Sequence, residues 1–238
     1  MTLSVVSPVY NSANTIYVLT EEIIKSVSEI TKDFEIILVD DGSKDESWKL
    51  IESVCMEHSY VKGIKLSENY GQHQAICAGL ENAKGEWLVI LDCDLQDNPS
   101  EIPNLYSKTK DDFKIVLAKR MNRKDTFFKK STSYIFWKMI SFLSKTKIHP
   151  LVGNFGIYHK NVISRFLESK KTEPYFSIAM QKFDFKKCYL DIEHQERKNL
   201  KSSYSLFKLI KHGIHVLMKT CGFQNNNFHN FTIEKKVN

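Results

Sequence analysis

The segment EWLVILDCDLQDNP, from Glu86 to Pro99, joins a run of apolar residues directly to three aspartates. The apolar run Trp87–Leu91 is typical of a strand buried in a sheet, and Asp92, Asp94 and Asp97 follow its end. Two carboxylates one residue apart repel each other, and removing them from water is costly unless a cation or a proton lies between them. The segment therefore predicts a buried strand that ends at a site for a positively charged group.

Apolar runs of this kind alternate with helical patterns through the first half of the chain. The predicted strands are Leu3–Ser7, Glu35–Val39, Val61–Leu66, Trp87–Leu91 and Lys114–Ala118. The predicted helices are Ala13–Thr31, Glu46–His58, His73–Ala83 and Ser100–Lys108. Runs such as EIILV and WLVIL are apolar without alternation, as expected when helices cover both faces of a parallel sheet. We therefore predict an α/β fold with a doubly wound, mostly parallel sheet and helices on both faces.

The second half of the chain is less regular. The pattern predicts an amphipathic segment at Phe127–Leu143, a helix at Tyr175–Gln181, a strand in KKCYLDIEH and a basic amphipathic helix near Tyr204–Met218. No internal repeat is visible, and a separate second domain is not required.

Charge is divided unevenly between the two halves. Residues 1–118 hold 10 basic and 20 acidic residues, a net charge of −10, whereas residues 119–238 hold 24 and 8, a net charge of +16. The basic half suits phosphates or an anionic membrane surface, although a lysine-rich solvated face gives the same pattern. The five cysteines lack any C-x-x-C spacing, which favours reduced thiols. With no signal peptide and no long apolar stretch, the sequence predicts a cytoplasmic protein that does not span a membrane.

Polar segments follow four successive predicted strands: SPVYN (Ser7–Asn11), DDGSKD (Asp40–Asp45), SENYGQHQA (Ser67–Ala75) and DCDLQD (Asp92–Asp97). In open parallel sheets, ligands bind outside the carboxyl ends of the strands, so these segments predict one binding rim. Carboxylate oxygens suit Mg²⁺ or Mn²⁺, which protein carboxylates often hold together with substrate phosphates. Solvated loop carboxylates or helix N-caps would explain the aspartates equally well if they stood alone.

Neither a P-loop nor a G-x-G-x-x-G motif is present, so a nucleotide would have to be held differently. Asp40 or Asp41 could accept hydrogen bonds from a base or ribose, with the PVYN turn packed against the base. Basic residues after the fifth strand, Lys119, Arg120, Arg123 and Lys124, could close over phosphates, or could form a solvated loop.

The ordered segments SVVSPVYN, FEIILVDDGSKDES, IKLSENYGQHQAICAGLENAKGEWLVILDCDLQDNP and VLAKR resemble family 2 glycosyltransferases with the GT-A fold. Within that family the resemblance is to dolichyl-phosphate mannosyltransferases and undecaprenyl-phosphate sugar transferases. It implies a nucleotide-diphosphate sugar as donor, inversion at the sugar carbon, and a divalent metal, Mg²⁺ or Mn²⁺, at Asp92 and Asp94. By the same resemblance Pro8, Tyr10, Asp40 and Asp41 would hold the nucleoside and Gln96 would lie by the sugar. Asn11 and Gln72 are further donor-binding candidates in the same strand-end segments.

The resemblance implies a donor-binding half at residues 1–120, an acceptor-side half at 121–220 and a polar tail at 221–238. Where the family often has G-D-F-R, this chain has Gly153-Asn154-Phe155-Gly156, and an asparagine cannot act as a general base. Either the acceptor is already anionic, as a lipid phosphate is, or another carboxylate such as Asp97 acts. ERKNLKSSY resembles the family segment R-x-x-G-x-S-x-Y, which would place Arg197, Ser202, Ser203 and Tyr204 on a loop over the diphosphate and acceptor. Leu200 replaces the glycine of that segment.

Three functions therefore remain open. The leading one is an inverting, metal-dependent glycosyltransferase that acts on a polyprenyl phosphate or a glycan of a cell-surface polysaccharide, with peripheral contact to the inner face of the membrane through its basic half. The second is a catalytically silent module that binds nucleotide sugars. The third is a phosphohydrolase with an aspartate nucleophile, which would leave the DDGS and PVYN segments without a role. Nucleic-acid binding is not expected, because the rim is acidic.

Overall fold

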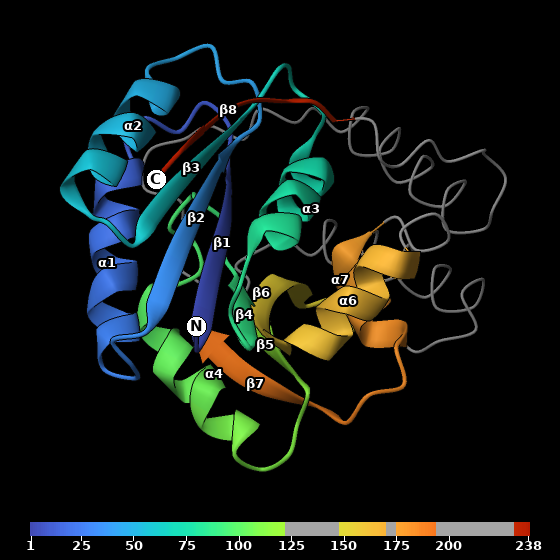
Figure 1. The fold of residues 1–238 in the computed structure, drawn as a ribbon. Coiled ribbons are helices and arrows are strands. Elements are labelled where there is room, and N and C mark those ends of the chain that lie inside the picture. Colours follow the sequence, from blue (N-terminus) through green and yellow to red (C-terminus); the bar gives the residue numbers. More distant parts are fainter. Residues whose placement is uncertain (122–147, 170–174, 194–230) are drawn as a thin grey trace, which may run out of the picture.

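The computed structural model describes residues 1–121, 148–169, 175–193 and 231–238. Its centre is a sheet with the strand order β7-β5-β6-β4-β1-β2-β3-β8 (Figure 1). The strands are β1 (Leu3–Val9), β2 (Phe34–Asp40), β3 (Val61–Leu66), β4 (Trp87–Ile90), β5 (Ile115–Met121), β6 (Val152–His159), β7 (Lys187–Glu193) and β8 (Ile233–Val237). The helices are α1 (Ile16–Ser28), α2 (Ser47–Glu57), α3 (Gln72–Asn82), α4 (Ile102–Thr109), α6 (Lys160–Ser169) and α7 (Phe176–Lys182), with a 3₁₀ turn at Pro99–Glu101.

Strands β1 to β4 form the parallel part of the sheet. β1 pairs with β2 on one side and with β4 on the other, and β3 pairs with β2, all in parallel. β6 runs antiparallel between β4 and β5, while β8 runs antiparallel along β3. The carboxyl ends of β1 to β4 therefore meet at one edge of the sheet, as the sequence predicts.

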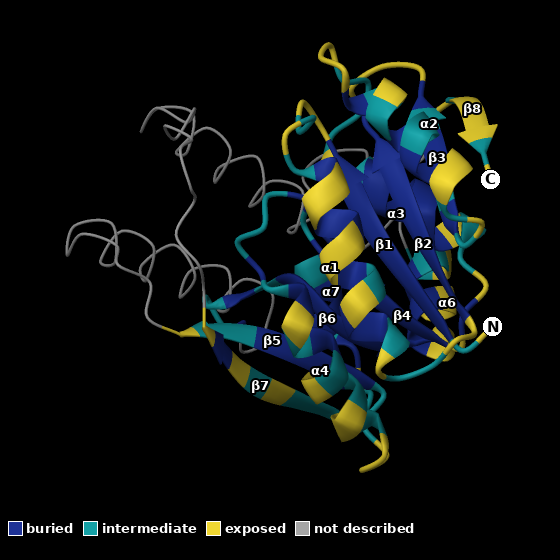
Figure 2. Cartoon of the chain, turned by 90° about the vertical axis from the view of Figure 1, so that its left-hand side faces the viewer, coloured by how far each residue is buried: buried dark blue, intermediate teal, exposed yellow. Residues whose placement is uncertain are grey.

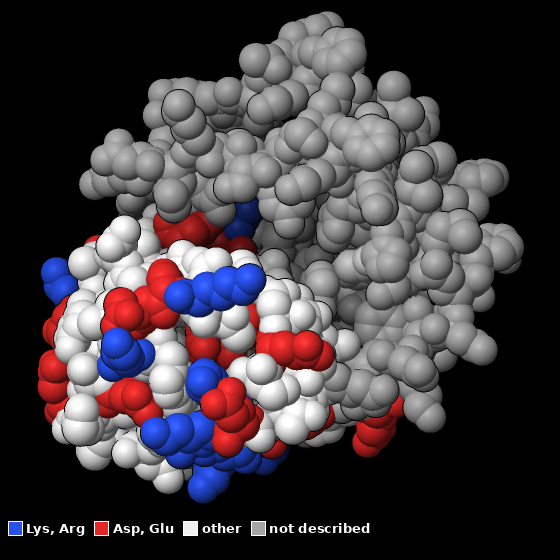
Figure 3. Space-filling view, turned by 90° about the horizontal axis from the view of Figure 1, so that it is seen from above, with Lys and Arg blue, Asp and Glu red and all other residues white. Residues whose placement is uncertain are grey.

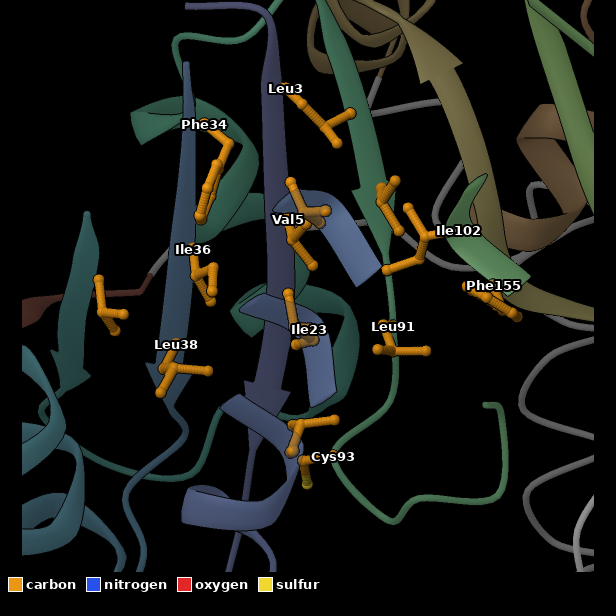
Figure 4. Close-up of a cluster of buried hydrophobic side chains, with 14 of the residues drawn as sticks. Leu3, Val5, Ile23, Phe34, Ile36, Leu38, Leu91, Cys93, Ile102 and Phe155 are labelled. Atoms are coloured by element: carbon orange, nitrogen blue, oxygen red, sulfur yellow. The ribbon is translucent and has the colours of Figure 1, made fainter. Parts of the chain in front are cut away.

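Two apolar clusters cover the two faces of the sheet. Figure 2 shows that the central strands of the sheet are buried and that the helices beside them expose part of their surface. Every residue of β1 and β2 is buried, which explains why these strands are apolar without alternation. On one face α1, α2 and α4 pack their apolar side chains on the sheet; Figure 4 shows Ile23 of α1 near Val5 of β1. On the other face lie α3, α6 and α7. Burying one such side chain contributes about 1.5–3 kcal/mol, so the layers stabilise each other over the whole sheet.

The structure differs from the sequence prediction mainly in the second half. The five predicted strands and four predicted helices of the first half, and the helix and strand near Tyr175–Gln181 and KKCYLDIEH, are confirmed with shifts at their ends. Strand β6 and helix α6 were not predicted. Within the predicted polar tail, residues Ile233–Val237 form β8. The predicted segments Phe127–Leu143 and Tyr204–Met218 lie outside the described residues.

Glycines explain why β6 is hard to recognise. A Cβ atom on Gly156 would lie 2.6 Å from the carbonyl oxygen of Val116 on β5, so this strand pair needs a glycine there. Because glycine weakens a strand pattern, the sequence VGNFGIYH reads as irregular although it forms a central strand.

Candidate active site

The carboxyl ends of β1 to β4 bring the four predicted polar segments together. We call this edge the rim; it comprises residues 10–13, 40–45, 67–72 and 92–97, and Figure 3 looks down on the molecule from this side. Of the predicted site aspartates, Asp40, Asp41 and Asp97 are buried and Asp92 and Asp94 are partly buried, whereas Tyr10 is 44% exposed. A buried acidic edge beside an exposed aromatic ring is suited to a ligand with a charged and a flat part.

Asp41 is a buried carboxylate held by backbone amides. It accepts hydrogen bonds from the N–H groups of Tyr70, at 2.8 Å, and Gly71, at 2.9 Å. Burial raises the pKa of Asp41 to about 6, against the lowering effect of these two bonds. Gly42, at φ +66°, permits the close approach, since a Cβ atom there would lie 2.5 Å from the backbone of Glu68.

Asp40 is fully buried, and neither of its carboxylate oxygens accepts a hydrogen bond of normal geometry from the described residues. Burial raises its pKa, while Ser43 and Lys65 lie near enough to lower it in part. A buried acceptor without a good donor costs about 1–3 kcal/mol. Asp40 therefore suits a ligand that brings a donor.

Asn11 links the rim segment after β1 to the rim segment after β2 by hydrogen bonds. At φ +47° its side-chain oxygen accepts a hydrogen bond from the backbone N–H of Lys44 at 2.8 Å, and its own N–H donates to Oγ of Ser43 at 2.9 Å. Pro8 is buried within β1. The structure thus places Asn11 as a link between loops, and Tyr10 as the exposed side chain of the PVYN turn.

The two aspartates of the D-x-D motif are partly exposed, and the residue between them is buried. The thiol of Cys93 donates a hydrogen bond to Oγ of Ser12 at 3.2 Å, which ties the motif to the loop after β1. Asp94 accepts a hydrogen bond from the backbone N–H of Gln96 at 3.1 Å, and Leu95 has φ +57°, an uncommon backbone angle for leucine. This tight turn keeps both carboxylates at the surface of the rim.

Asp92 is surrounded by three polar side chains. Nε2 of Gln72 donates to its Oδ1 at 2.7 Å, Nη2 of Arg120 lies 3.8 Å from its Oδ2, and the side chain of Asn154 lies near enough to lower its pKa. Burial, together with the negative charges of Asp97 and Asp94, nevertheless raises the pKa of Asp92 to about 6 against the lowering effect of Arg120. Among the described residues, Asp92, Asp94 and Asp97 therefore bring more negative charge to the site than Arg120 brings positive charge.

Asp97 and Arg120 form a buried ion pair. Nε of Arg120 donates to Oδ1 of Asp97 at 2.9 Å and Nη2 to Oδ2 at 2.5 Å, and Asp97 is fully buried. The guanidinium packs on Gly153, where a Cβ atom would lie 3.2 Å from Nη2. Because both its oxygens serve this pair, Asp97 is placed to fix Arg120 beside Asp92.

The structure does not place Lys119 beside Asp92, Asp97 and Arg120. Its ammonium pairs with Asp191 of β7 at 2.9 Å, because neighbouring residues of a strand point to opposite faces. Arg123, Lys124, Arg197, Ser202, Ser203 and Tyr204 lie outside the described residues.

The residues at the end of β4 fit a hard divalent cation that is shared with a ligand. They offer two carboxylates, and within the described parts of the chain no group of three or more His, Cys, Asp or Glu side chains could hold a metal. The remaining ligands would have to come from phosphate oxygens and water, which is how Mg²⁺ is commonly held.

The site thus combines four parallel strands, a buried aspartate pair at the end of β2 and a D-x-D motif after β4. The sequence profile of Glycosyl transferase family 2 matches residues 4–167, and the chain belongs to that family. The chain is 36% identical over 213 residues to the undecaprenyl-phosphate 4-deoxy-4-formamido-L-arabinose transferase of Proteus mirabilis strain HI4320, covering 87% of this chain and 64% of that protein. The corresponding protein of Photorhabdus laumondii is 33% identical over 209 residues, with the same coverage. The chain thus spans about 64% of the length of these relatives.

Solved structures show the same fold at low sequence identity. Glucosyl-3-phosphoglycerate synthase from Mycobacterium tuberculosis, in complex with Mn²⁺, UDP-glucose and phosphoglyceric acid, superimposes with a TM-score of 0.61 at 15% identity, covering 99% of this chain and 89% of that one. TarS 1–349 of S. aureus, in complex with UDP-GlcNAc, gives a TM-score of 0.59 at 18% identity, covering 91% and 65%. The predicted GT-A fold is therefore confirmed.

Backbone groups at the rim were missed by the sequence analysis. The N–H groups of Tyr70 and Gly71 hold Asp41, but a backbone amide has no residue-type signature. The glycine in SENYGQHQA was the available signal, since Gly71 has φ +94° at the start of α3.

Proposed function

We propose that this chain transfers a sugar from a nucleotide-diphosphate sugar to a polyprenyl phosphate, with inversion and with a divalent metal. The observation that carries the proposal is the gathering of the buried Asp40 and Asp41 and the partly buried Asp92 and Asp94 at the rim, where the pKa of both Asp41 and Asp92 is raised to about 6. Perturbed groups of this kind cluster at functional sites, and these lie where an open sheet binds ligands.

The donor nucleoside would lie between β1 and β2. Asp40 offers a buried acceptor to a donor group of the base or ribose, and Tyr10 offers an exposed ring for stacking. Pro8 and Asn11 shape the turn that carries Tyr10, and Gln96 would lie by the sugar at the turn of the D-x-D motif.

The diphosphate would lie over Asp92 and Asp94. When bound there, Mg²⁺ or Mn²⁺ supplies positive charge that stabilises the departing diphosphate. Gln72 and Asn154 orient the carboxylate of Asp92, while Asp97 holds the guanidinium of Arg120 beside it. The glucosyl-3-phosphoglycerate synthase, which shares the fold, was crystallised in complex with Mn²⁺ and UDP-glucose, and this supports the assignment.

The acceptor is inferred from positions 154 and 97, the two described positions considered for a general base. Asn154 cannot remove a proton, and both oxygens of Asp97 are bound to Arg120. A phosphate oxygen is already anionic, so it can attack the sugar carbon directly. The new bond joins that carbon to the acceptor phosphate oxygen as the bond to the donor diphosphate breaks, which inverts the carbon and requires no proton transfer. The names of the relatives, which act on undecaprenyl phosphate, support the same acceptor.

A lipid acceptor implies work at a membrane surface. Among the described residues, no helix is both long and apolar enough to cross a bilayer. The net charge of +16 on residues 119–238 supports peripheral contact with the anionic inner face of the membrane from the cytoplasm.

Transfer of labelled sugar from UDP-, GDP-, dTDP- and CDP-sugars tests the proposal, with polyprenyl phosphate and a neutral glycan as alternative acceptors. We expect metal-dependent product on the phosphate acceptor. Transfer to the glycan alone would reject the lipid acceptor, and nucleotide binding without any turnover would favour a silent binding module. Release of phosphate from a simple phosphomonoester, with no transfer, would favour a phosphohydrolase.

A further inference from the structure

Strand β8 extends the sheet beside β3 and begins at the rim (Figure 1). Ile233 lies opposite Leu66 at the carboxyl end of β3, and Val237 lies opposite Gly63 nearer its other end. The backbone N–H of Ser67 donates to the carbonyl of Thr232 at 2.9 Å. The contact between β8 and β3 therefore continues into the first residue of the 67–72 loop.

Apolar side chains of residues 231–237 pack against the rest of the protein at two places. At the rim end, Phe231 and Ile233 pack against the apolar cluster that also receives Tyr70 of the loop. At the far end, Val237 packs against the opposite cluster, and a Cβ atom on Gly63 would lie 2.7 Å from its side chain. The ion pairs of Lys65 with Glu234, Lys235 with Glu52, and the bond from Lys236 to Asn82 are exposed and contribute little. Apolar packing and the backbone ladder hold β8.

The 67–72 loop in turn contacts carboxylates on two different strands. Its Tyr70 and Gly71 amides bind Asp41 after β2, and its Gln72 side chain binds Asp92 after β4. The loop thus lies between β8 on its outer side and both parts of the proposed donor site on its inner side.

We infer that β8 is a positioning element of the donor site, because it fixes the loop that orients Asp41 and Asp92. None of the interactions described above joins a residue of β8 to Asp41 or Asp92. Its effect passes through Ser67 and Tyr70 to the amides of the loop and to Gln72. A site of this kind loses affinity when its supporting residues shift, even by about 0.5 Å. The inference rests on the proposed function for the ligand that is bound there.

The two ends of β8 provide a matched pair of variants. Ile233→Ala shortens an apolar, partly buried side chain at the rim end, and Val237→Ala shortens one at the far end of the same strand. A chain lacking residues 231–238 removes the whole element. Two quantities are measured on each: the dissociation constant of the nucleoside diphosphate that binds the wild-type chain best with Mn²⁺, and the amide hydrogen exchange rates of Tyr70 and Gly71 without nucleotide.

We expect the deletion to weaken nucleotide binding about tenfold or more, which corresponds to about 1.4 kcal/mol, and to speed exchange at both amides. Ile233→Ala should reproduce part of both effects, whereas Val237→Ala should change neither by more than about twofold. Unchanged exchange in the deletion, or equal effects of the two point variants, would overturn the inference. Failure of the wild-type chain to bind any nucleotide would instead reject the proposed function, and the exchange rates would still decide whether β8 holds the loop.

Discussion

Buried carboxylates at the two edges of the parallel sheet have pKa values that are shifted in opposite directions. At the amino edge, Glu35 is fully buried and accepts hydrogen bonds from Oγ of Ser4 at 2.7 Å, Nζ of Lys62 at 2.6 Å and the backbone N–H of Lys84 at 2.6 Å. Burial raises its pKa, but the bonds from these three partners outweigh burial and lower it overall. The protein itself satisfies this carboxylate.

At the carboxyl edge, Asp40, Asp41 and Asp92 all have a raised pKa. Asp40 and Asp41 are as deeply buried as Glu35 and Asp92 is partly buried, but the donors among the described residues are too few to offset this burial. Folding alone would favour partners like those of Glu35, so the difference marks the carboxyl edge as a site that a ligand completes. Four changes can break or sharpen this contrast.

The largest effect is expected from Asp94→Asn. Loss of a metal ligand should remove several kcal/mol of stabilisation from the departing diphosphate and slow sugar transfer about a thousandfold or more. Initial rates at saturating donor measure this. Asp111→Asn, at an exposed loop position, is the control and should leave the rate unchanged. A loss of less than about tenfold in Asp94→Asn would argue against a metal ligand there.

Breaking the Asp97–Arg120 pair should be the largest change in stability. Arg120→Leu leaves a buried carboxylate without its partner, which typically costs about 3–5 kcal/mol. Urea denaturation measures the free energy of unfolding. The double variant Asp97→Leu, Arg120→Leu should recover part of the loss, because no unpaired charge remains. Equal stability of the wild type and Arg120→Leu would show that the pair does not form.

Glu35→Gln should weaken the amino edge without touching the rim. The amide cannot replace the ion pair with Lys62, so we expect a loss of about 1–3 kcal/mol in the free energy of unfolding. The nucleotide dissociation constant at saturating Mn²⁺ should stay the same within about twofold, because Glu35 lies at the opposite end of the strands. A parallel loss of nucleotide affinity would mean that the two edges are not independent.

The pH dependence of stability should differ between the edges. The folded pKa of Asp41 is raised to about 6, so between about pH 4 and 6 the folded chain binds more protons than the unfolded chain and stability falls as pH rises. In Asp41→Asn the free energy of unfolding should therefore decrease less between about pH 4 and 6, by roughly 1 kcal/mol or more. Glu35, whose folded pKa is lowered, contributes stability above its unfolded pKa that is lost as pH falls through the folded value. Denaturant titrations from pH 3 to 8 compare the two variants; an identical slope for Asp41→Asn and wild type between pH 4 and 6 would contradict the raised pKa.

Much of the rim could be predicted from the sequence. Unbroken apolar runs indicated parallel strands, and the polar residues after them, such as Asp41 and Asp92, fell at the edge where parallel strands end together. A strand end fixes the place of a side chain without any knowledge of distant contacts. That part of the site follows from local pattern alone.

The rest depends on contacts between distant segments. The position of β5 between β6 and β7 decides that Arg120 pairs with Asp97 and that Lys119 pairs with Asp191, away from the rim. The alternation of a strand does indicate that only one of two neighbouring residues can face the rim, but not which one. Strand β8 was missed because its sequence, IEKKV, is mostly charged, as suits the edge of a sheet.

The most direct test of the central claim is calorimetric titration of UDP, GDP, dTDP and CDP into the wild-type chain and Asp94→Asn, each with and without Mn²⁺. The account predicts that one nucleotide class binds the wild type, that Mn²⁺ tightens the binding at least about tenfold, and that Asp94→Asn removes this gain. Binding that is equally tight with and without Mn²⁺, or unchanged in Asp94→Asn, would contradict a shared metal at the end of β4.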